Sequence, residues 1–240
     1  MTALTAQTRT EVLLTLRRGE SLLLILAIPL LLLGFFSVVD VLPKGDFEQS
    51  VDFLVPGVLA LAIMSTGMVQ LAIGTSFERQ YGVLKRLGAT PLGRPRLLAA
   101  KTSSIVAVEL VQIVLVVGLG LALGWDPQLT VAVIPAVILG TIAFSGIGLL
   151  MAGRLRGEVT LAAANGLYLV LLLIGGMVVP LSELPEGLRW LAELLPSGAL
   201  AQALVGTMST GGGVPTKAWV VLTVWAVAAP LAAARTFRWE

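Results

Sequence analysis

Six long stretches with few or no charged side chains run through this 240-residue chain, and they constrain its fold more than any local motif. A helix needs about 20 apolar residues to cross a bilayer, because it rises about 1.5 Å per residue through about 30 Å of hydrocarbon. We therefore expect an all-α membrane protein with six transmembrane helices, built as one domain over residues 1–240. The expected spans are residues 21–39, 53–77, 102–124, 128–152, 160–181 and 218–234.

The composition supports this class and excludes several kinds of chemistry. Hydrophobic residues make up 57% of the chain and charged residues 12%, whereas soluble domains have about 25% charged residues. A cleaved secretory signal is the alternative for the first stretch, but its apolar run exceeds the usual length of about 7–15 residues. The chain has no Cys and no His, which removes thiol chemistry, imidazole catalysis and Cys/His metal sites. We predict no catalytic, cofactor-binding or metal-binding residues.

The charges between the spans separate by sign and predict the orientation of the chain. Cytoplasmic loops of membrane proteins carry an excess of Lys and Arg. With the N-terminus in the cytoplasm, 13 of the 16 basic residues fall on the cytoplasmic side, and the outer segments collect acidic residues such as Asp46 and Glu186. We therefore expect both termini in the cytoplasm. Because topology accounts for the basic residues, the high pI predicts no nucleic-acid partner.

A seventh uncharged stretch, residues 194–216, is not counted as a span. Its prolines and the glycine run at 211–213 make it too interrupted for a helix that faces lipid. Pro185 can begin a helix, and leucines at helical spacing follow it. We expect a short outer or re-entrant helix within residues 186–206 that breaks at Pro196 and continues as an irregular, glycine-rich connection. A solvated loop is the alternative.

The N-terminal segment has a weaker amphipathic pattern. Val12, Leu13 and Leu16 share one face between basic residues, so residues 5–19 are predicted to form a helix in the inner membrane interface. A disordered tail is the alternative.

Residues 78–101, between the second and third spans, form the most informative loop. They include six basic residues, and Gly88, Pro91, Gly93 and Pro95 interrupt the helical pattern. A cytoplasmic helix with an apolar edge and basic neighbours suits docking onto a soluble partner, and contact with anionic lipid is an equally good explanation. The apolar edge consists of Tyr81, Val83, Leu84 and Leu87, beside the basic Lys85 and Arg86.

This loop resembles that of permeases of type-2 ATP-binding-cassette exporters, including the daunorubicin-resistance-like transmembrane subunits. The family pattern is an acidic–basic pair, a glycine, an apolar–basic stretch, Thr-Pro and a closing lysine. A second similarity follows the fifth span, in a pattern of glycine, Pro-Leu, Leu-Pro and proline. The loop positions are Glu78, Arg79, Gly82, Leu84, Lys85, Arg86, Leu87, Thr90, Pro91 and Lys101, and the later positions are Gly176, Pro180, Leu181, Leu184, Pro185 and Pro196.

The resemblance implies a permease subunit that works as a dimer with a second copy or homologue, above two copies of a cassette ATPase. Residues 83–92 would form the coupling helix, and ATP-driven closure of the ATPases would drive alternating access. The chain contains no Gly-Lys dipeptide and hence no Walker A loop, so we expect it to hydrolyse no ATP itself. The ATPase-coupling residues implied are Glu78, Arg79, Gly82, Val83, Leu84, Lys85, Arg86, Leu87, Thr90 and Pro91.

Four polar residues within the spans are candidates for a substrate pathway: Gln70, Glu109, Gln112 and Asn165. Glu109 is the only ionisable residue well inside a span, about 12 Å beyond Lys101 at the helical rise. Intramembrane carboxylates are costly and commonly functional. For Glu109 we favour a structural role, such as pairing inside the bundle, over a site for a substrate cation. For the other three, hydrogen bonds between helices are the simpler explanation.

The predicted function is an exporter permease that moves amphipathic drugs, antibiotics or lipid-like molecules out of the cytoplasm or inner leaflet. Such a subunit would act in multidrug efflux or antibiotic resistance, in a bacterial cell membrane. An ion-coupled secondary transporter is the alternative, but it normally needs several embedded acidic groups. A non-transporting membrane assembly subunit remains open. Substrate identity and the choice between homodimer and heterodimer are not encoded in a recognisable pattern.

Overall fold

The computed structural model describes residues 19–39, 47, 49–88, 94–128, 130–209 and 215–238. This part of the chain is helical and contains no strand. The predicted interfacial helix at residues 5–19 falls almost wholly outside the described residues. In chain order the α-helices are α2 (Gly19–Val38), α3 (Ser50–Met64), α4 (Leu71–Gln80), α5 (Val83–Gly88), α6 (Arg94–Ala122), α7 (Val133–Ala152), α8 (Gly157–Ile174), α9 (Glu186–Leu194), α10 (Pro196–Met208) and α11 (Thr216–Thr236).

The second predicted span is one continuous helical rod. The π-helix η1 (Ser65–Gln70) joins α3 to α4, so the rod extends over residues 50–80. A π-helix adds a residue to the turn and is often found at functional sites. Pro56 lies inside α3, about midway along it. Among the candidate spans in the described part of the chain, the rod has the most buried stretch, because almost every α3 residue from Val51 to Met64 is apolar and is enclosed by neighbours.

Five of the described helices are long and apolar enough to cross a membrane. They are Ser50–Gln80, Ala100–Ala122, Val133–Ala152, Gly157–Ile174 and Thr216–Thr236. The first predicted span corresponds to α2. Its apolar stretch Ile25–Val38 is shorter than the other five spans. The all-helical membrane fold is thus confirmed, while the count of six spans stays a prediction. The fourth span starts later than predicted and the fifth ends earlier, at Ile174.

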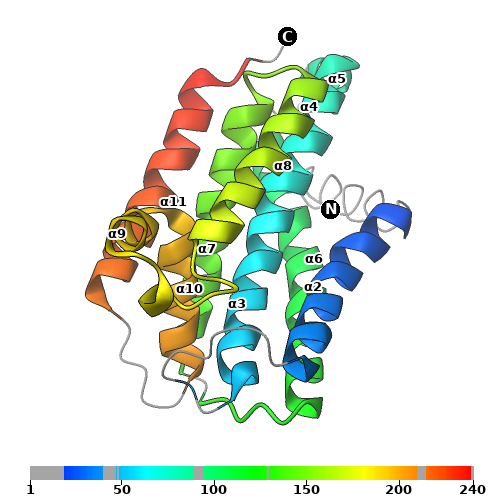
Figure 1. The fold of residues 1–240 in the computed structure, drawn as a ribbon. Coiled ribbons are helices and arrows are strands. Elements are labelled where there is room, and N and C mark those ends of the chain that lie inside the picture. The colour runs from blue at the N-terminus through cyan, green and yellow to red at the C-terminus, as the bar shows by residue number, and fades with distance from the viewer. Residues whose placement is uncertain are drawn as a thin grey trace.

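The helices surround α3 and form two ends, shown in Figure 1. At the upper end lie α4, α5 and the C-terminal end of α11; we call this the α5 end. At the opposite end lie the start of α3, the α6–α7 connection and the end of α10. The α7 helix packs most extensively on α11, and it also contacts α4 and η1. Since α7 lies between these partners, it connects both halves of the bundle.

Glycines allow these helices to approach closely. A Cβ atom on Gly148 of α7 would lie 2.7 Å from the carbonyl oxygen of Met68, and one on Gly146 would lie 2.6 Å from the ring of Pro230 in α11. Neither space holds a methyl group without a shift of the backbone. Small residues at helix interfaces provide much of the van der Waals contact that holds membrane helices together.

The segment after α8 differs from the sequence prediction in one respect. The short amphipathic helix is present as α9, directly after Pro185. Residues 196–208, however, form the regular helix α10 rather than an irregular connection, and this part of the prediction was wrong. Pro196 occupies the first turn of α10, where its missing N–H group costs nothing. Most of α10 is buried against α3, α7 and α11.

The turn of the α9–α10 hairpin lies level with the middle of α11. The indole Nε1 of Trp225, near the middle of α11, donates a hydrogen bond to the carbonyl oxygen of Leu194 over 3.0 Å. At the other end of α10, Ser209 Oγ donates to the carbonyl oxygen of Asp52 at the start of α3 over 3.2 Å. The hairpin therefore runs from about the middle of the bundle to the end opposite α5.

Candidate transport groove and coupling end

The predicted apolar edge of the coupling loop is divided in the structure. Tyr81 and Val83 are exposed beside Lys85 and Arg86, whereas Leu84 has no exposed surface. Leu84 packs into a small cluster with side chains that include Leu71, Ile105, Leu149 and Phe237. It therefore holds α5 on the bundle, and the exposed residues form the surface open to a partner. Thr90 and Pro91, and the side chain of Leu87, lie outside the described residues.

A buried ion pair closes the base of the coupling loop. The ammonium group of Lys101, at the start of the membrane part of α6, pairs with the carboxylate of Glu78 in α4. The Lys101 side chain is 3% exposed and that of Glu78 is 21% exposed. These two residues begin and end the predicted loop. The pair joins the two helices between which α5 lies.

Arg79 and Gln80 connect the same end of α4 to the turn between α7 and α8. Arg79 Nη1 donates to the carbonyl oxygen of Gly153 over 3.0 Å, and its Nη2 donates to the carbonyl oxygen of Leu155. The amide of Gly157 donates to Gln80 Oε1 over 2.9 Å. The α4–α6 and α7–α8 connections are thus tied together through one end of α4.

A groove opens beside η1, between α2 and α8. Two adjoining cavities, of about 570 and 170 Å³, share the side chains of Ile25, Ser65, Val69 and Asn165. Together they run from Tyr81 and Val83 at the α5 end to Tyr168. Both α2 and α8 pack on the central rod, which forms the floor. We call this the α2–α8 groove.

Two of the four predicted pathway residues lie in this groove. Gln70 and Asn165 line its larger cavity. The side-chain carbonyl oxygen of Gln70 is buried and accepts no hydrogen bond within the described residues. The amide nitrogen of Asn165 donates to the carbonyl oxygen of Leu161, one turn earlier in α8, over 2.8 Å. The groove wall is thus mainly apolar with a few hydrogen-bonding groups, as binding sites for amphipathic molecules are.

The other two predicted residues lie outside the groove and connect helices. Thr66 Oγ1 donates to Gln112 Oε1 over 2.9 Å, and Gln112 Nε2 donates to the carbonyl oxygen of Ile25 over 3.2 Å. Gln112 therefore joins the π-helix, α6 and α2. Thr141 Oγ1 of α7 donates to Glu109 Oε2 of α6 over 2.5 Å. The sequence-based interpretation of both residues as contacts between helices agrees with this geometry.

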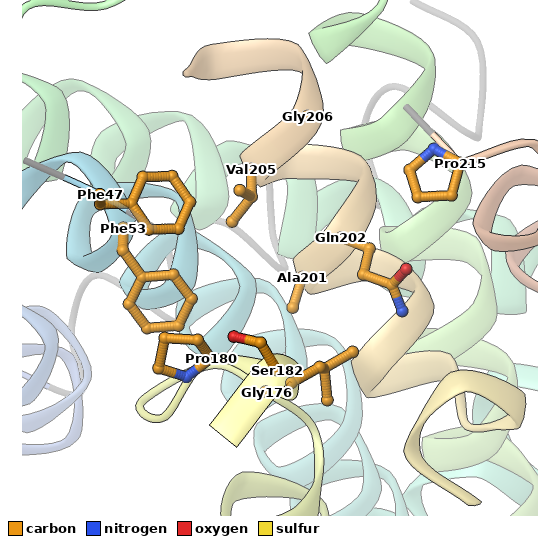
Figure 2. A pocket seen from close by; sticks show the side chains of 11 residues that line it. Phe47, Phe53, Gly176, Pro180, Ser182, Ala201, Gln202, Val205, Gly206 and Pro215 are labelled. Atoms are coloured by element: carbon orange, nitrogen blue, oxygen red, sulfur yellow. The ribbon is translucent and has the colours of Figure 1, made fainter. Parts of the chain in front are cut away.

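A further cavity, of about 220 Å³, lies outside the groove, at the end opposite α5. Figure 2 shows the rings of Phe47 and Phe53 on one side and Gln202 of α10 on the other. The two ring centroids are 5.7 Å apart. Pro180 and Ser182, from the connection after α8, lie between them. No local sequence pattern indicates this cavity, because its walls come from segments far apart in the chain.

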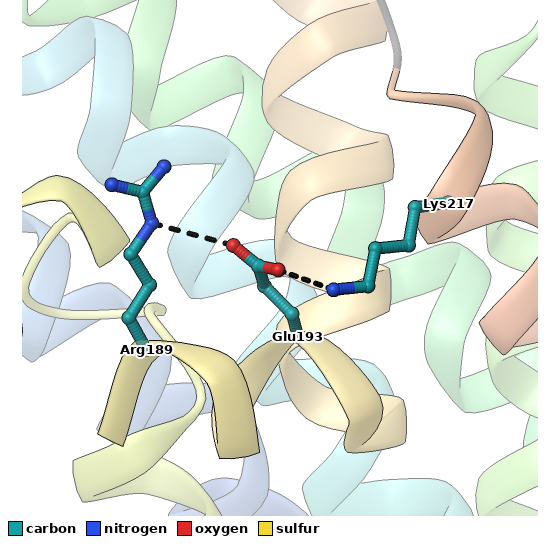
Figure 3. A network of polar contacts seen from close by, with 3 residues as sticks. All are labelled: Arg189, Glu193 and Lys217. Atoms are coloured by element: carbon teal, nitrogen blue, oxygen red, sulfur yellow. Dashed lines mark hydrogen bonds and ion pairs between the residues drawn. The ribbon is translucent and has the colours of Figure 1, made fainter. Parts of the chain in front are cut away.

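An ion-pair network joins α9 to the start of α11 near this cavity (Figure 3). Glu193 accepts a hydrogen bond from Lys217 Nζ over 2.6 Å and another from Arg189 Nε over 3.3 Å. The hydrogen bond from Lys217 lowers the pKa of the Glu193 carboxyl group. Since all three side chains are partly exposed, the network orients the hairpin more than it stabilises the fold.

The buried helices, the apolar faces and the membrane-length rods together define a polytopic membrane protein. The family model of the ABC-2 type transporter matches residues 2–209, and the chain therefore belongs to this family. The predicted resemblance to a type-2 cassette permease is thereby confirmed. A search against curated proteins found no match. The family domain is the transmembrane subunit of the transporter and not its ATPase.

Two features of the structure were not predicted from the sequence. They are the hydrogen-bond partners of the predicted coupling residues and the π-helix η1. Arg79 belonged to the family pattern, but nothing in the pattern indicates that it binds Gly153 and Leu155. No composition signal marks Ser65–Gln70 as π-helical.

Proposed function

We propose that this chain is the permease subunit of a cassette exporter of the daunorubicin-resistance-like kind, with six spans and both termini in the cytoplasm. Its substrates would be amphipathic drugs, antibiotics or lipid-like molecules, and the α2–α8 groove would be their path. The observation that carries this proposal is that the groove reaches from the exposed face of α5 into the middle of the bundle. A partner that binds α5 thus acts directly beside the substrate.

The shape of the groove supports a dimer. The groove has a floor and two sides, but between α2 and α8 it stays open. In a membrane, an open side would expose Asn165 to hydrocarbon, where polar groups without a partner are costly, and would leave the unpaired oxygen of Gln70 close beneath it. A second permease copy that faces the groove would cover these groups and leave a shared path between the two subunits.

Coupling to an ATPase would use the connections at the α5 end. The ATPase would bind Val83, Lys85 and Arg86, which are exposed. Because Leu84 anchors α5 and the Glu78–Lys101 pair closes the loop, a push on α5 would move α4 and α6 together. Arg79 would carry the same movement to the α7–α8 turn.

The coupling proposal is tested by co-purification with a cassette ATPase encoded beside the gene of this chain. Lys85→Glu should reduce complex formation and substrate-stimulated ATPase activity by at least about tenfold, as loss of charge-assisted hydrogen bonds does. Arg156→Glu is the matched control, because Arg156 is also exposed at the α5 end but lies outside α5. If both variants bind and stimulate the ATPase like the parent chain, α5 is not the docking element.

The orientation is tested with single cysteines, because the chain contains no Cys. Tyr81 and Val131 are 70% and 84% exposed and lie at opposite ends of the bundle. A membrane-impermeant maleimide should label Val131→Cys in intact cells and Tyr81→Cys only after lysis. Labelling of Tyr81→Cys in intact cells would place the α5 end outside and refute the proposal.

A further inference from the structure

A cleft of about 270 Å³ separates α6 from α7, away from the groove described above. The α6 helix packs mainly on α2 and α3 and touches α7 at few points. The rim of the cleft is apolar and exposed, with Leu110 on α6 and Ile138 on α7 among its side chains. No residue lines both this cleft and the α2–α8 groove. In a bilayer the rim would face the hydrocarbon.

Glu109 lies at the bottom of this cleft with one oxygen unused. The residue is 2% exposed. Its Oε2 accepts the hydrogen bond from Thr141, whereas its Oε1 is buried and has no hydrogen-bond partner in the described part of the chain. The Lys101 ammonium group, on the same helix, is instead paired with Glu78. An orphaned acceptor in an apolar site carries a free-energy cost, which a hydrogen-bond donor would remove.

From this geometry we infer that the α6–α7 cleft binds one amphipathic amine from the lipid, with the amine nitrogen hydrogen-bonded to Glu109 Oε1 and the alkyl tail along Leu110 and Ile138. A weak base enters hydrocarbon as the neutral amine. The carboxyl group and the amine hold one proton between them, and with that proton on the nitrogen an ammonium faces a carboxylate in a pair with no net charge. The ammonium N–H groups then donate to the oxygen that the bundle leaves unpaired.

The cleft should distinguish among amphipathic ligands that share a tail and differ in their head group. An alcohol with the same tail fills the same space, but it forms a weaker hydrogen bond because it carries no charge. A quaternary ammonium has no N–H donor and cannot enter as a neutral molecule. An anionic amphiphile would place a second acceptor beside Glu109. Strong binding should therefore require both a basic nitrogen with a hydrogen and an apolar chain.

The test uses the full chain in nanodiscs of phosphatidylcholine, a lipid without a primary amine that could compete. Binding of radiolabelled dodecylamine is measured near neutral pH in the absence of any ATPase. Saturable binding is expected, with dodecanol and dodecyltrimethylammonium at least about tenfold weaker. Glu109→Gln, which keeps the shape and can still accept from Thr141, should weaken dodecylamine binding to a similar extent.

Two tryptophan variants distinguish binding in the cleft from binding elsewhere on the lipid-facing surface of the protein. Leu110→Trp fills the cleft and should abolish saturable binding while the carboxyl group stays in place. Val114→Trp is the matched control, because Val114 is 71% exposed one turn further along α6 and does not line the cleft. It should bind like the parent chain.

Several results would overturn this site. Equal dodecylamine affinity in the parent chain and Glu109→Gln would show that the carboxyl group plays no part. Equal affinity for dodecanol would show that only the tail is bound. A similar loss in Leu110→Trp and Val114→Trp would place the ligand on the lipid-facing surface. Because no ATPase and no transport are involved, these outcomes are independent of the proposed export function.

Discussion

The hydrogen bond between Thr66 and Gln112 allows a quantitative test of how the central rod is held. Both side chains are buried, at 0% and 2% exposed, and they join the π-helix to α6. Hydrogen bonds between membrane helices contribute about 0.6 kcal/mol on average and at most about 1.7 kcal/mol. A double-mutant cycle of Thr66→Val and Gln112→Leu should therefore give a coupling energy of about 0.6–1.7 kcal/mol. Gln112→Leu should cost more than Thr66→Val, because it also removes the bond to Ile25.

The cycle is measured by unfolding the four proteins in mixed micelles with a denaturing detergent and following helix content. Thr75→Val provides the matched control, because Thr75 is 1% exposed and its Oγ1 has no hydrogen-bond partner in the described residues. This change should be neutral or stabilising, since it removes an unpaired polar atom from a buried site. Additive effects of the two test changes, with a coupling energy below about 0.2 kcal/mol, would refute the role of this bond.

Three further predictions concern the helix contacts, the α5 end and the ion-pair network. Gly148→Ala should destabilise the protein by about 1–3 kcal/mol, because its Cβ would meet the Met68 carbonyl oxygen, whereas Gly118→Ala, with no atom within 4 Å, should be neutral or slightly stabilising in the same unfolding assay. Arg79→Met should lower stability by about 2 kcal/mol through loss of its charged hydrogen bonds, and a loss below about 0.5 kcal/mol would contradict this role. Glu193→Gln should cost about 0.5 kcal/mol at neutral pH. Because the pKa of Glu193 is lowered in the folded state, the parent protein should lose this advantage as the pH falls below about 4, and a constant difference in melting temperature across that range would rule out the ion pair as its source.

Much of the membrane fold could be predicted because hydropathy is a property of each segment by itself. Five of the predicted spans coincide with long apolar helices, and Pro185 correctly indicated the start of α9. The error at residues 196–208 has a clear physical origin. A proline after an amphipathic helix was interpreted as a break, yet it equally well begins the next helix. Polar composition argued against a helix in lipid, but α10 is enclosed by protein and contacts little lipid.

The candidate sites were less predictable, because pairing between distant residues leaves no local pattern. Gln70 and Asn165 were both selected for their polarity, and only the packing of α2 and α8 around the rod places them in one groove. Glu109 is hydrogen-bonded to Thr141 of α7, but its unused oxygen and the cleft beside it depend on how far α7 lies from α6. A cavity is defined by its walls, and these come from several segments.

The sequence by itself determined that the chain belongs in a bilayer, which loops carry the positive charge, and to which transporter family the chain is related. Each of these depends on composition or on short motifs that a linear pattern records. Only the tertiary structure decided that Leu84 points inward, that Glu78 pairs with Lys101, and that α10 is buried. These features arise from the distances between helices, which follow from how all side chains pack together and not from any one segment.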